Sequence, residues 1–88
     1  MGDSDRVDRL SDASRRYWWW NGRRTRSARL DVLIYRLDEG GWMIELREGG
    51  HTGFIRWLPA ATEDEALRLA ALVRQVGDGW RPVPLDDG

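Results

Sequence analysis

The sequence predicts an α+β fold in which a meander of three or four antiparallel strands packs on one C-terminal α-helix, preceded by an N-terminal helix or a flexible leader. Three observations support this fold class. Residues 30–58 contain alternating apolar stretches separated by glycine turns at 40–41 and 49–50. Residues 62–76 have apolar side chains at helical spacing behind a strong N-terminal cap. The chain has 88 residues, which is the length of one domain.

Residues 30–37 are predicted to form the first strand of the meander. They are rich in β-branched and large apolar residues, which suit a pleated and half-buried surface. Both faces are apolar, with Leu30, Val32 and Ile34 on one side and Leu33, Tyr35 and Leu37 on the other. We therefore expect this strand to be covered on both faces, as it would be if the N-terminal segment folded over the side opposite the helix.

Residues 42–48 are predicted to form the central strand, and residues 52–58 the third. In the central strand Trp42, Ile44 and Leu46 should point inward, while Met43, Glu45 and Arg47 should point outward. The third strand should end before Pro59, because proline cannot donate a hydrogen bond to the ladder. The meander therefore has two tight glycine turns and one clearly alternating strand.

The stretch 62–76 carries the strongest helix signal. Thr62 and Glu65 form a capping box, and Gly77 provides a helix stop. The predicted apolar stripe should lie across the Trp42 face of the sheet, and it consists of Ala66, Leu69, Leu72, Val73 and Val76. After the helix, Trp80 should pack back onto the fold, and residues 81–88 are expected to form an acidic tail that contains proline.

The N-terminal part divides into two segments. Residues 1–16 form an acidic leader, in which apolar spacing up to Tyr17 fits a short helix and the composition equally fits a flexible chain. Residues 17–29 read as an aromatic and basic hairpin or arm, with a type I′ turn at Asn21-Gly22. Alternation places Trp18 and Trp20 on one face and Trp19 with Tyr17 on the other, so that Trp19 is the ring expected to face outward.

Composition excludes several kinds of chemistry. The chain has no cysteine and one histidine, His51, so a disulfide, a thiolate metal site or a serine triad is hard to assemble. We expect no catalytic residues, no metal and no cofactor, and hence no enzyme. The sequence shows neither a long apolar run nor a secretory signal, so we expect a cytoplasmic protein that does not bind a membrane.

Charge is segregated along the chain although the total is only −1. Residues 1–12 hold four aspartates and two arginines, whereas residues 13–30 hold six arginines and no acid. Such asymmetry favours an anionic partner for the basic part, either DNA or RNA. The residues predicted to bind it are Arg15, Arg16, Trp19, Arg23, Arg24, Arg26 and Arg29. The alternative is a protein partner that uses the same tryptophan and arginine side chains as anchors. The oligomeric state is left open.

A further expectation comes from a resemblance to known DNA-binding domains. The residues that carry it are Gly41-Trp42 at the start of the middle strand, Trp57-Leu58 in the third strand, and residues 62–66 at the start of the helix. Over residues 30–76 this order resembles the AP2-type three-stranded DNA-binding domain and the arm-binding domain of phage-type integrases. The resemblance implies DNA binding through the exposed sheet face, which in this chain would present Met43, Glu45 and Arg47.

Overall fold

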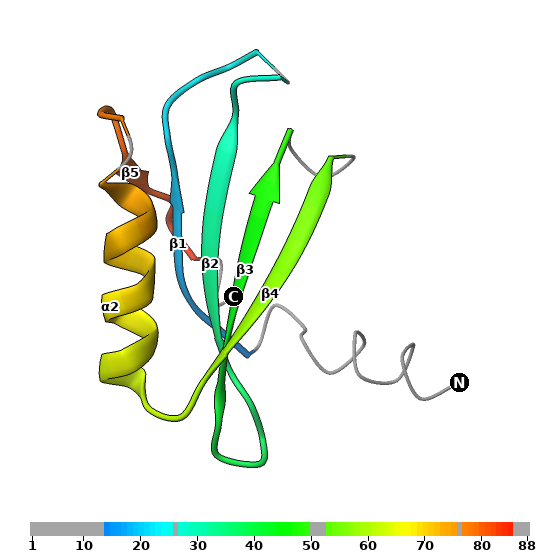
Figure 1. Cartoon of the computed structure of the whole chain (residues 1–88), viewed down its shortest axis with the longest axis vertical. Helices are drawn as coiled ribbons and strands as arrows, with labels where there is room; N and C mark the ends of the chain where they lie inside the picture. The colour runs from blue at the N-terminus through cyan, green and yellow to red at the C-terminus, as the bar shows by residue number, and fades with distance from the viewer. Residues whose placement is uncertain (1–13, 26, 50–52, 76, 86–88) are drawn as a thin grey trace.

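The structure is a computed structural model that describes residues 14–25, 27–49, 53–75 and 77–85. These residues form an antiparallel sheet in one layer and a helix that packs on one of its faces (Figure 1). The strand order in the sheet is β4-β3-β2-β1-β5. In chain order the elements are β1 (Arg15–Trp20), β2 (Leu30–Arg36), β3 (Trp42–Glu48), β4 (Phe54–Ala60), α2 (Glu63–Arg74) and β5 (Arg81–Pro82). The predicted α+β fold class is confirmed, with β1 as the fourth strand and β5 as an addition.

The register of β2, β3 and β4 divides the side chains between two faces as the alternation predicts. Val32 lies opposite Leu46, and Ile34 opposite Ile44, on the face that α2 covers. Partly buried side chains surround this core: Tyr17, Trp19, Trp42, Leu46, Leu58, Leu67, Leu69, Val73 and Trp80. Leu33 and Tyr35 are also buried, on the opposite face, so the prediction that β2 is covered on both faces is confirmed. The leader proposed as its second cover lies outside the described residues, apart from its last few positions.

Helix α2 begins and packs largely as predicted. The Thr62 hydroxyl accepts a hydrogen bond from the Glu65 main-chain N–H at 3.2 Å, and Glu65 Oε1 accepts one from the Ala61 N–H at 2.7 Å. The buried positions are Ala66 and Ala70, whose small side chains let the helix lie close to the sheet.

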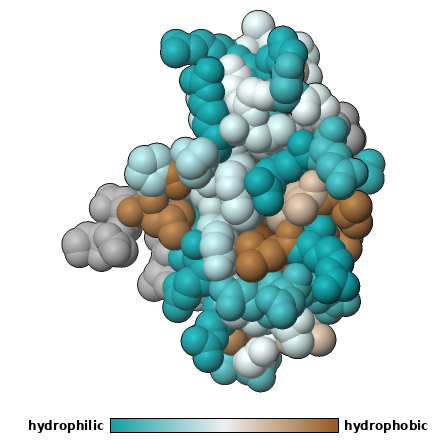
Figure 2. Space-filling view, turned by 90° about the vertical axis from the view of Figure 1, so that its left-hand side faces the viewer, coloured by the Kyte–Doolittle hydropathy of each residue, from teal (hydrophilic) through white to brown (hydrophobic). Residues whose placement is uncertain are grey.

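The predicted apolar stripe of α2 is wrong at one position, Leu72. Leu72 is 54% exposed, because the strip that touches the sheet is centred on the two alanines. On the side of the molecule that carries α2, Figure 2 shows hydrophobic surface among hydrophilic side chains. The helix ends at Arg74 with Gln75 as its C-cap, and Gly77 follows with a positive φ of 83°.

The segment before β2 differs from the prediction at both ends. A helix that reaches Tyr17 is wrong, because β1 begins at Arg15 and pairs with β2. The two-residue type I′ turn is also wrong, since that turn needs a positive φ at Asn21 and only Gly22 has one, at 77°. The connection is instead a longer loop over 21–29, and β2 starts at Leu30.

Two proline-containing stretches were predicted to be outside the sheet and lie within it. Strand β4 continues through Pro59 to Ala60, with Pro59 opposite Met43. Proline is tolerated there because β4 is at the edge of the sheet. The predicted tail also begins as a strand, because β5 pairs with β1 through Trp19 and Pro82. The expected packing of Trp80 onto the core is confirmed.

Candidate nucleic-acid interface

Trp19 is not the outward-facing ring that the sequence predicts. Its ring stacks on that of Tyr17, with centroids 5.6 Å apart, and the Arg74 guanidinium lies 4.1 Å from its centroid. Both aromatic rings pack against the core under α2, because β1 presents this face to the helix. A cation over the ring face adds an attractive interaction and covers the surface on which a base would stack. Trp19 therefore belongs to the fold.

Arg15 and Arg29 lie on the opposite face of the sheet, each against a tryptophan of β1. The Arg15 guanidinium is 4.8 Å from the Trp18 ring centroid, and that of Arg29 is 4.7 Å from the Trp20 centroid. Arg29 also donates to both carboxylate oxygens of Asp31, at 2.8 and 3.1 Å. This hydrogen bond raises the pKa of Arg29 above its ordinary value. The arginines thus serve as cover for tryptophans and as a counter-charge for a buried carboxylate.

The remaining predicted binding residues are in different surroundings. Arg16 is exposed, and one of its side-chain nitrogens donates to the Arg15 carbonyl oxygen at 3.3 Å. Arg26 lies outside the described residues. Arg23 and Arg24 are exposed on the loop 21–29, at the end of the sheet away from the start of α2. Of the seven predicted residues, the structure therefore brings Arg23 and Arg24 together on an open surface.

Asn21 links the two ends of the loop 21–29 by hydrogen bonds. The Asn21 side-chain oxygen accepts hydrogen bonds from the main-chain N–H groups of Arg23 and Leu30, at 3.2 and 3.1 Å. Its amide group donates to the Ala28 carbonyl at 2.8 Å. Within the loop, the Thr25 carbonyl accepts from the N–H groups of residues 28 and 29 at 3.1 and 3.0 Å. The two exposed arginines therefore project from an internally bonded loop.

A third arginine joins this loop from the C-terminal end of the chain. Gly22 and Gly79 lie so close that a Cβ on Gly22 would come within 2.9 Å of the Gly79 carbonyl oxygen and 3.5 Å of Arg81 Nε. Both glycines have a positive φ, which permits the two turns to meet. Arg81 is exposed and lies opposite Trp20 in the β1–β5 ladder. We call Arg23, Arg24 and Arg81 the basic pole.

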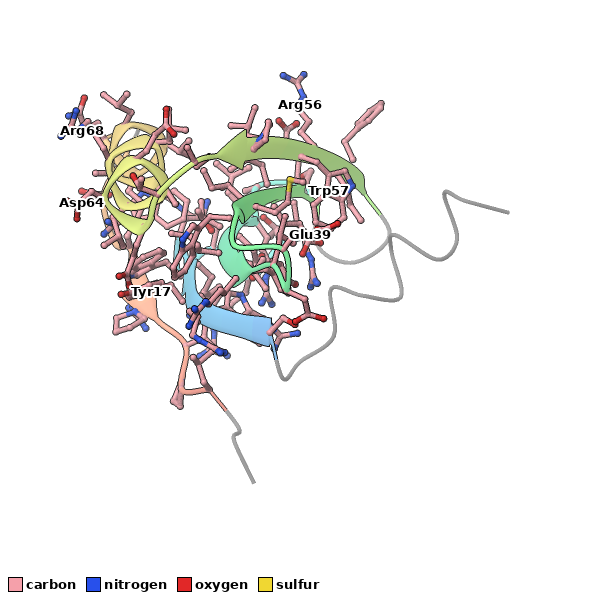
Figure 3. All side chains as sticks on the ribbon, turned by 90° about the horizontal axis from the view of Figure 1, so that it is seen from below. Tyr17, Glu39, Arg56, Trp57, Asp64 and Arg68 are labelled. Carbon is pink, nitrogen blue, oxygen red and sulfur yellow. The ribbon has the colours of Figure 1, made fainter. Side chains whose placement is uncertain are left out.

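Acidic side chains gather at the other end of the molecule. The first turn of α2 and the turn after β2 both lie at the lower end in Figure 1, and Figure 3, seen from that end, labels Glu39 and Asp64. The acidic residues of these two segments are Asp38, Glu39, Glu63, Asp64 and Glu65. Near the basic pole the exposed acids among the described residues are Glu48, which lies opposite Leu30, and Asp78, whereas Asp31 is buried. Arg16 and Arg36 also lie at the acidic end, so the described charges are only partly separated along the molecule.

The face opposite α2 holds a buried polar network that sequence reasoning missed. Glu45, predicted to point into solvent, is 3% exposed and accepts hydrogen bonds from the Tyr35 hydroxyl at 2.6 Å and from Arg47 Nε at 2.5 Å. Burial, with the carboxylate beside it, raises the pKa of Tyr35 to about 12. Asp31 is equally buried and accepts from Trp18 Nε1 at 2.9 Å. Since each carboxylate is already occupied by donors, neither is open to a ligand.

Three large apolar residues of β4 are exposed and were not among the predicted site residues. Phe54 is 77%, Ile55 42% and Trp57 38% exposed. The sequence signal that could have identified them is the position of β4 as the last strand of the meander, which leaves one edge unpaired. Figure 3 shows Arg56 and Trp57 pointing to opposite sides of this strand.

Other kinds of site find little support. An open hollow of about 340 Å³ lies at the acidic end, lined by Ser14, Arg16, Arg36, Leu37 and Asp38. In the described part of the chain, no group of three or more His, Cys, Asp or Glu side chains is placed to hold a metal ion. No helix formed by the described residues is long and apolar enough to cross a membrane.

Comparisons with protein-family models, with curated proteins and with solved structures find no match to this chain. The resemblance to the AP2-type domain therefore stays a prediction.

Proposed function

We propose that the protein binds nucleic acid, and that the basic pole contacts backbone phosphates. One observation carries this proposal: two exposed arginines on an internally hydrogen-bonded loop lie beside a third from β5, while most of the exposed acids among the described residues gather at the other end. Arginine donates two parallel hydrogen bonds to a phosphate, so three guanidinium groups can follow one strand of a backbone. The unequal distribution of charge between the two ends would also orient the protein as it approaches the nucleic acid, with the acidic end pointing away from the polyanion.

The surroundings of the tryptophans favour phosphate contacts over base recognition. Trp18, Trp19 and Trp20 each have a guanidinium over the ring, from Arg15, Arg74 and Arg29. With all three tryptophans of β1 covered in this way, and with no described strand or helix projecting at the basic pole to enter a groove, sequence discrimination should be weak. We therefore propose binding that depends on charge and salt and only slightly on base sequence.

Fluorescence anisotropy with labelled 20-mer duplex DNA, single-stranded DNA and duplex RNA tests the proposal. Each phosphate contact should contribute about −0.9 to the slope of log K against log salt on duplex DNA. Replacing Arg23 and Arg24 together by alanine should weaken binding at least about tenfold at low salt. It should also reduce the magnitude of that slope by about 1.8, because two phosphates would no longer be neutralised.

The matched control replaces Arg56 and Arg68 together by alanine. Both are exposed, lie away from the basic pole, and carry the same total charge. Arg74 is unsuitable as a control because it covers Trp19. No binding of any of the three probes at 20 mM salt, or an equal loss in the control pair, would contradict the proposal.

Binding to another polypeptide is a second candidate function, favoured by the exposed side chains of β4. Phe, Ile, Trp and Arg side chains along a strand with one open edge suit a partner that adds a strand to the sheet. A partner protein whose affinity falls with Ile55→Lys but not with the Arg23/Arg24 double substitution would support this candidate. The reverse pattern would assign the partner to the basic pole.

A further inference from the structure

Strand β4 combines an open edge with an unusual amount of exposed apolar surface. It is the terminal strand of the sheet, it is seven residues long, and Phe54, Ile55 and Trp57 are all at least 38% exposed. Natural proteins usually protect such an edge with charges, bulges or a covering segment. Within β4 the only charged residue is Arg56. The strand is therefore able to pair with another one.

Pro59 indicates which main-chain groups of β4 face the open side. Proline has no N–H, so an antiparallel ladder accommodates it where that group would point away from the neighbouring strand. Pro59 is paired with Met43 in an unbroken register, and main-chain direction alternates along a strand. Residues two apart have their main-chain groups on the same edge of a strand. Ile55 and Trp57 therefore present both N–H and C=O on the open edge, and Pro59 presents its C=O there.

We propose that two copies of this chain pair through β4, antiparallel and with Trp57 opposite Trp57, to join their sheets into one. This register sets Ile55 opposite Pro59, so the Ile55 N–H of each copy meets a Pro59 carbonyl. The two Trp57 residues exchange a pair of hydrogen bonds. Every N–H that Ile55 and Trp57 present on the open edge thus finds an acceptor, although Pro59 donates none.

Side-chain size and charge favour the same register. Phe54 lies opposite Ala60, which places the most exposed ring of β4 against a small residue. Arg56 lies opposite Leu58, whereas a register centred on Arg56 would place two like charges directly opposite each other. Residues directly opposite share a face, so α2 of both copies lies on the same side of the joined sheet.

The pairing also places opposite charges near each other. Arg56 of one copy faces Leu58 of the other copy. Ala61 follows that Leu58 by three residues, which is about 10 Å along the chain at about 3.4 Å per residue. Glu65 keeps its carboxylate at Ala61 through the 2.7 Å hydrogen bond to the Ala61 N–H. This separation is about one screening length in 0.1 M salt, roughly 10 Å, so the attraction between the acidic first turn of α2 and Arg56 of the other copy is reduced but not abolished. The two symmetry-related pairs of opposite charge favour a second copy as the occupant of the edge.

Sedimentation velocity over a concentration series of the full chain tests the pairing, together with the variants Ile55→Pro and Ile55→Lys. Ile55→Pro removes an edge N–H, as Pro59 already does, and Ile55→Lys keeps the main chain but adds a charge to the edge. Each should weaken dimer formation at least about tenfold while circular dichroism and the melting temperature show a folded chain. The control Leu85→Ser removes an exposed apolar residue outside β4 and should dimerise like the wild type.

Amide hydrogen exchange gives a second measurement that does not depend on a variant. The Ile55 and Trp57 amides should become protected as the protein concentration rises. A chain that stays monomeric up to 1 mM with concentration-independent exchange at these amides overturns the proposal, even if a foreign peptide occupies β4. A dimer that both Ile55 variants leave unchanged overturns it too. Neither result affects nucleic-acid binding at the basic pole, which is measured separately.

Discussion

The Tyr35 hydroxyl donates a 2.6 Å hydrogen bond to Glu45 on the sheet face opposite α2, and neither side chain is more than 3% exposed. Glu45 lies directly opposite Leu33, so the bond crosses diagonally from β2 to β3. Arg47 supplies the counter-charge to the same carboxylate. A second carboxylate on this face, Asp31, is satisfied in the same way by Trp18 and Arg29. The buried acids thus link the strands of this face through charged hydrogen bonds.

Tyr35→Phe should lower the free energy of unfolding by about 1–2 kcal/mol, because a buried carboxylate loses one of its two donor residues while Arg47 stays in place. Urea unfolding followed by tryptophan fluorescence measures the change. Tyr17→Phe is the matched control, since its hydroxyl bonds to Glu63 at an exposed position and should contribute less. Equal losses in the two variants would contradict a special role for the buried bond.

The same tyrosine should make stability depend on alkaline pH. Its pKa is raised from 10.0 to about 12, so the folded state holds the phenolic proton more tightly than the unfolded state. The stability that comes from this proton is complete below pH 10 and is lost as the pH rises from 10 through 12. Wild type should therefore lose more stability between pH 9.5 and 11.5 than Tyr35→Phe does. Parallel pH profiles for the two proteins would show that the phenol does not contribute.

Asp31→Ala should destabilise the fold by about 2–3 kcal/mol. The substitution leaves the Trp18 indole N–H without its acceptor and removes the partner of Arg29. Asp38→Ala, at an exposed turn position, should change stability by less than about 0.5 kcal/mol. Thermal and urea unfolding of both variants give the comparison. A loss at position 31 as small as that at position 38 would mean that the ion pair does not stabilise the folded state.

The elements that the sequence predicts well are those whose signal is local. The capping box at Thr62 and Glu65 is a short-range pattern, and α2 begins where it predicts. The strand over 42–48 has its predicted bounds, because period-2 alternation and flanking glycines define it. The turn prediction for the loop 21–29 is wrong because Asn21 bonds across nine positions to Leu30, a contact that an Asn-Gly pair does not reveal.

The candidate site was only partly predictable for a related reason. A sequence shows that arginines are clustered, but not which of them are already engaged. Arg29 sits two residues from Asp31, and only the strand geometry shows that both point to the same face and pair. Arg81 is distant in sequence and reaches the basic pole through β5, which has only two residues. Long-range strand pairing and cation–π contacts carry no local sequence signature.

Arg74→Ala should lower the free energy of unfolding by about 1 kcal/mol and shift the tryptophan emission to longer wavelength. The guanidinium covers the Trp19 ring at 4.1 Å, so its removal takes away a cation–π contact and lets water reach the indole. Arg68→Ala, on an exposed position of the same helix, should change neither quantity. Chemical unfolding and emission spectra of both variants test this. Identical spectra for the two variants would contradict the assigned contact.

Gly22→Ala should damage both the fold and binding at the basic pole, whereas Gly40→Ala should damage only the fold. Both glycines have a positive φ, at 77° and 99°, so each substitution introduces backbone strain of about 1 kcal/mol. A Cβ at Gly40 meets nothing within 4 Å, but one at Gly22 would lie 2.9 Å from the Gly79 carbonyl oxygen and push apart the loops that carry Arg23 and Arg81. The Gly22 variant should therefore be less stable than the Gly40 variant in urea unfolding, and it alone should bind duplex DNA more weakly in the anisotropy assay. If both variants bind DNA equally well, the contact between Gly22 and Gly79 does not hold the basic pole together, and Arg23 and Arg24 act without Arg81.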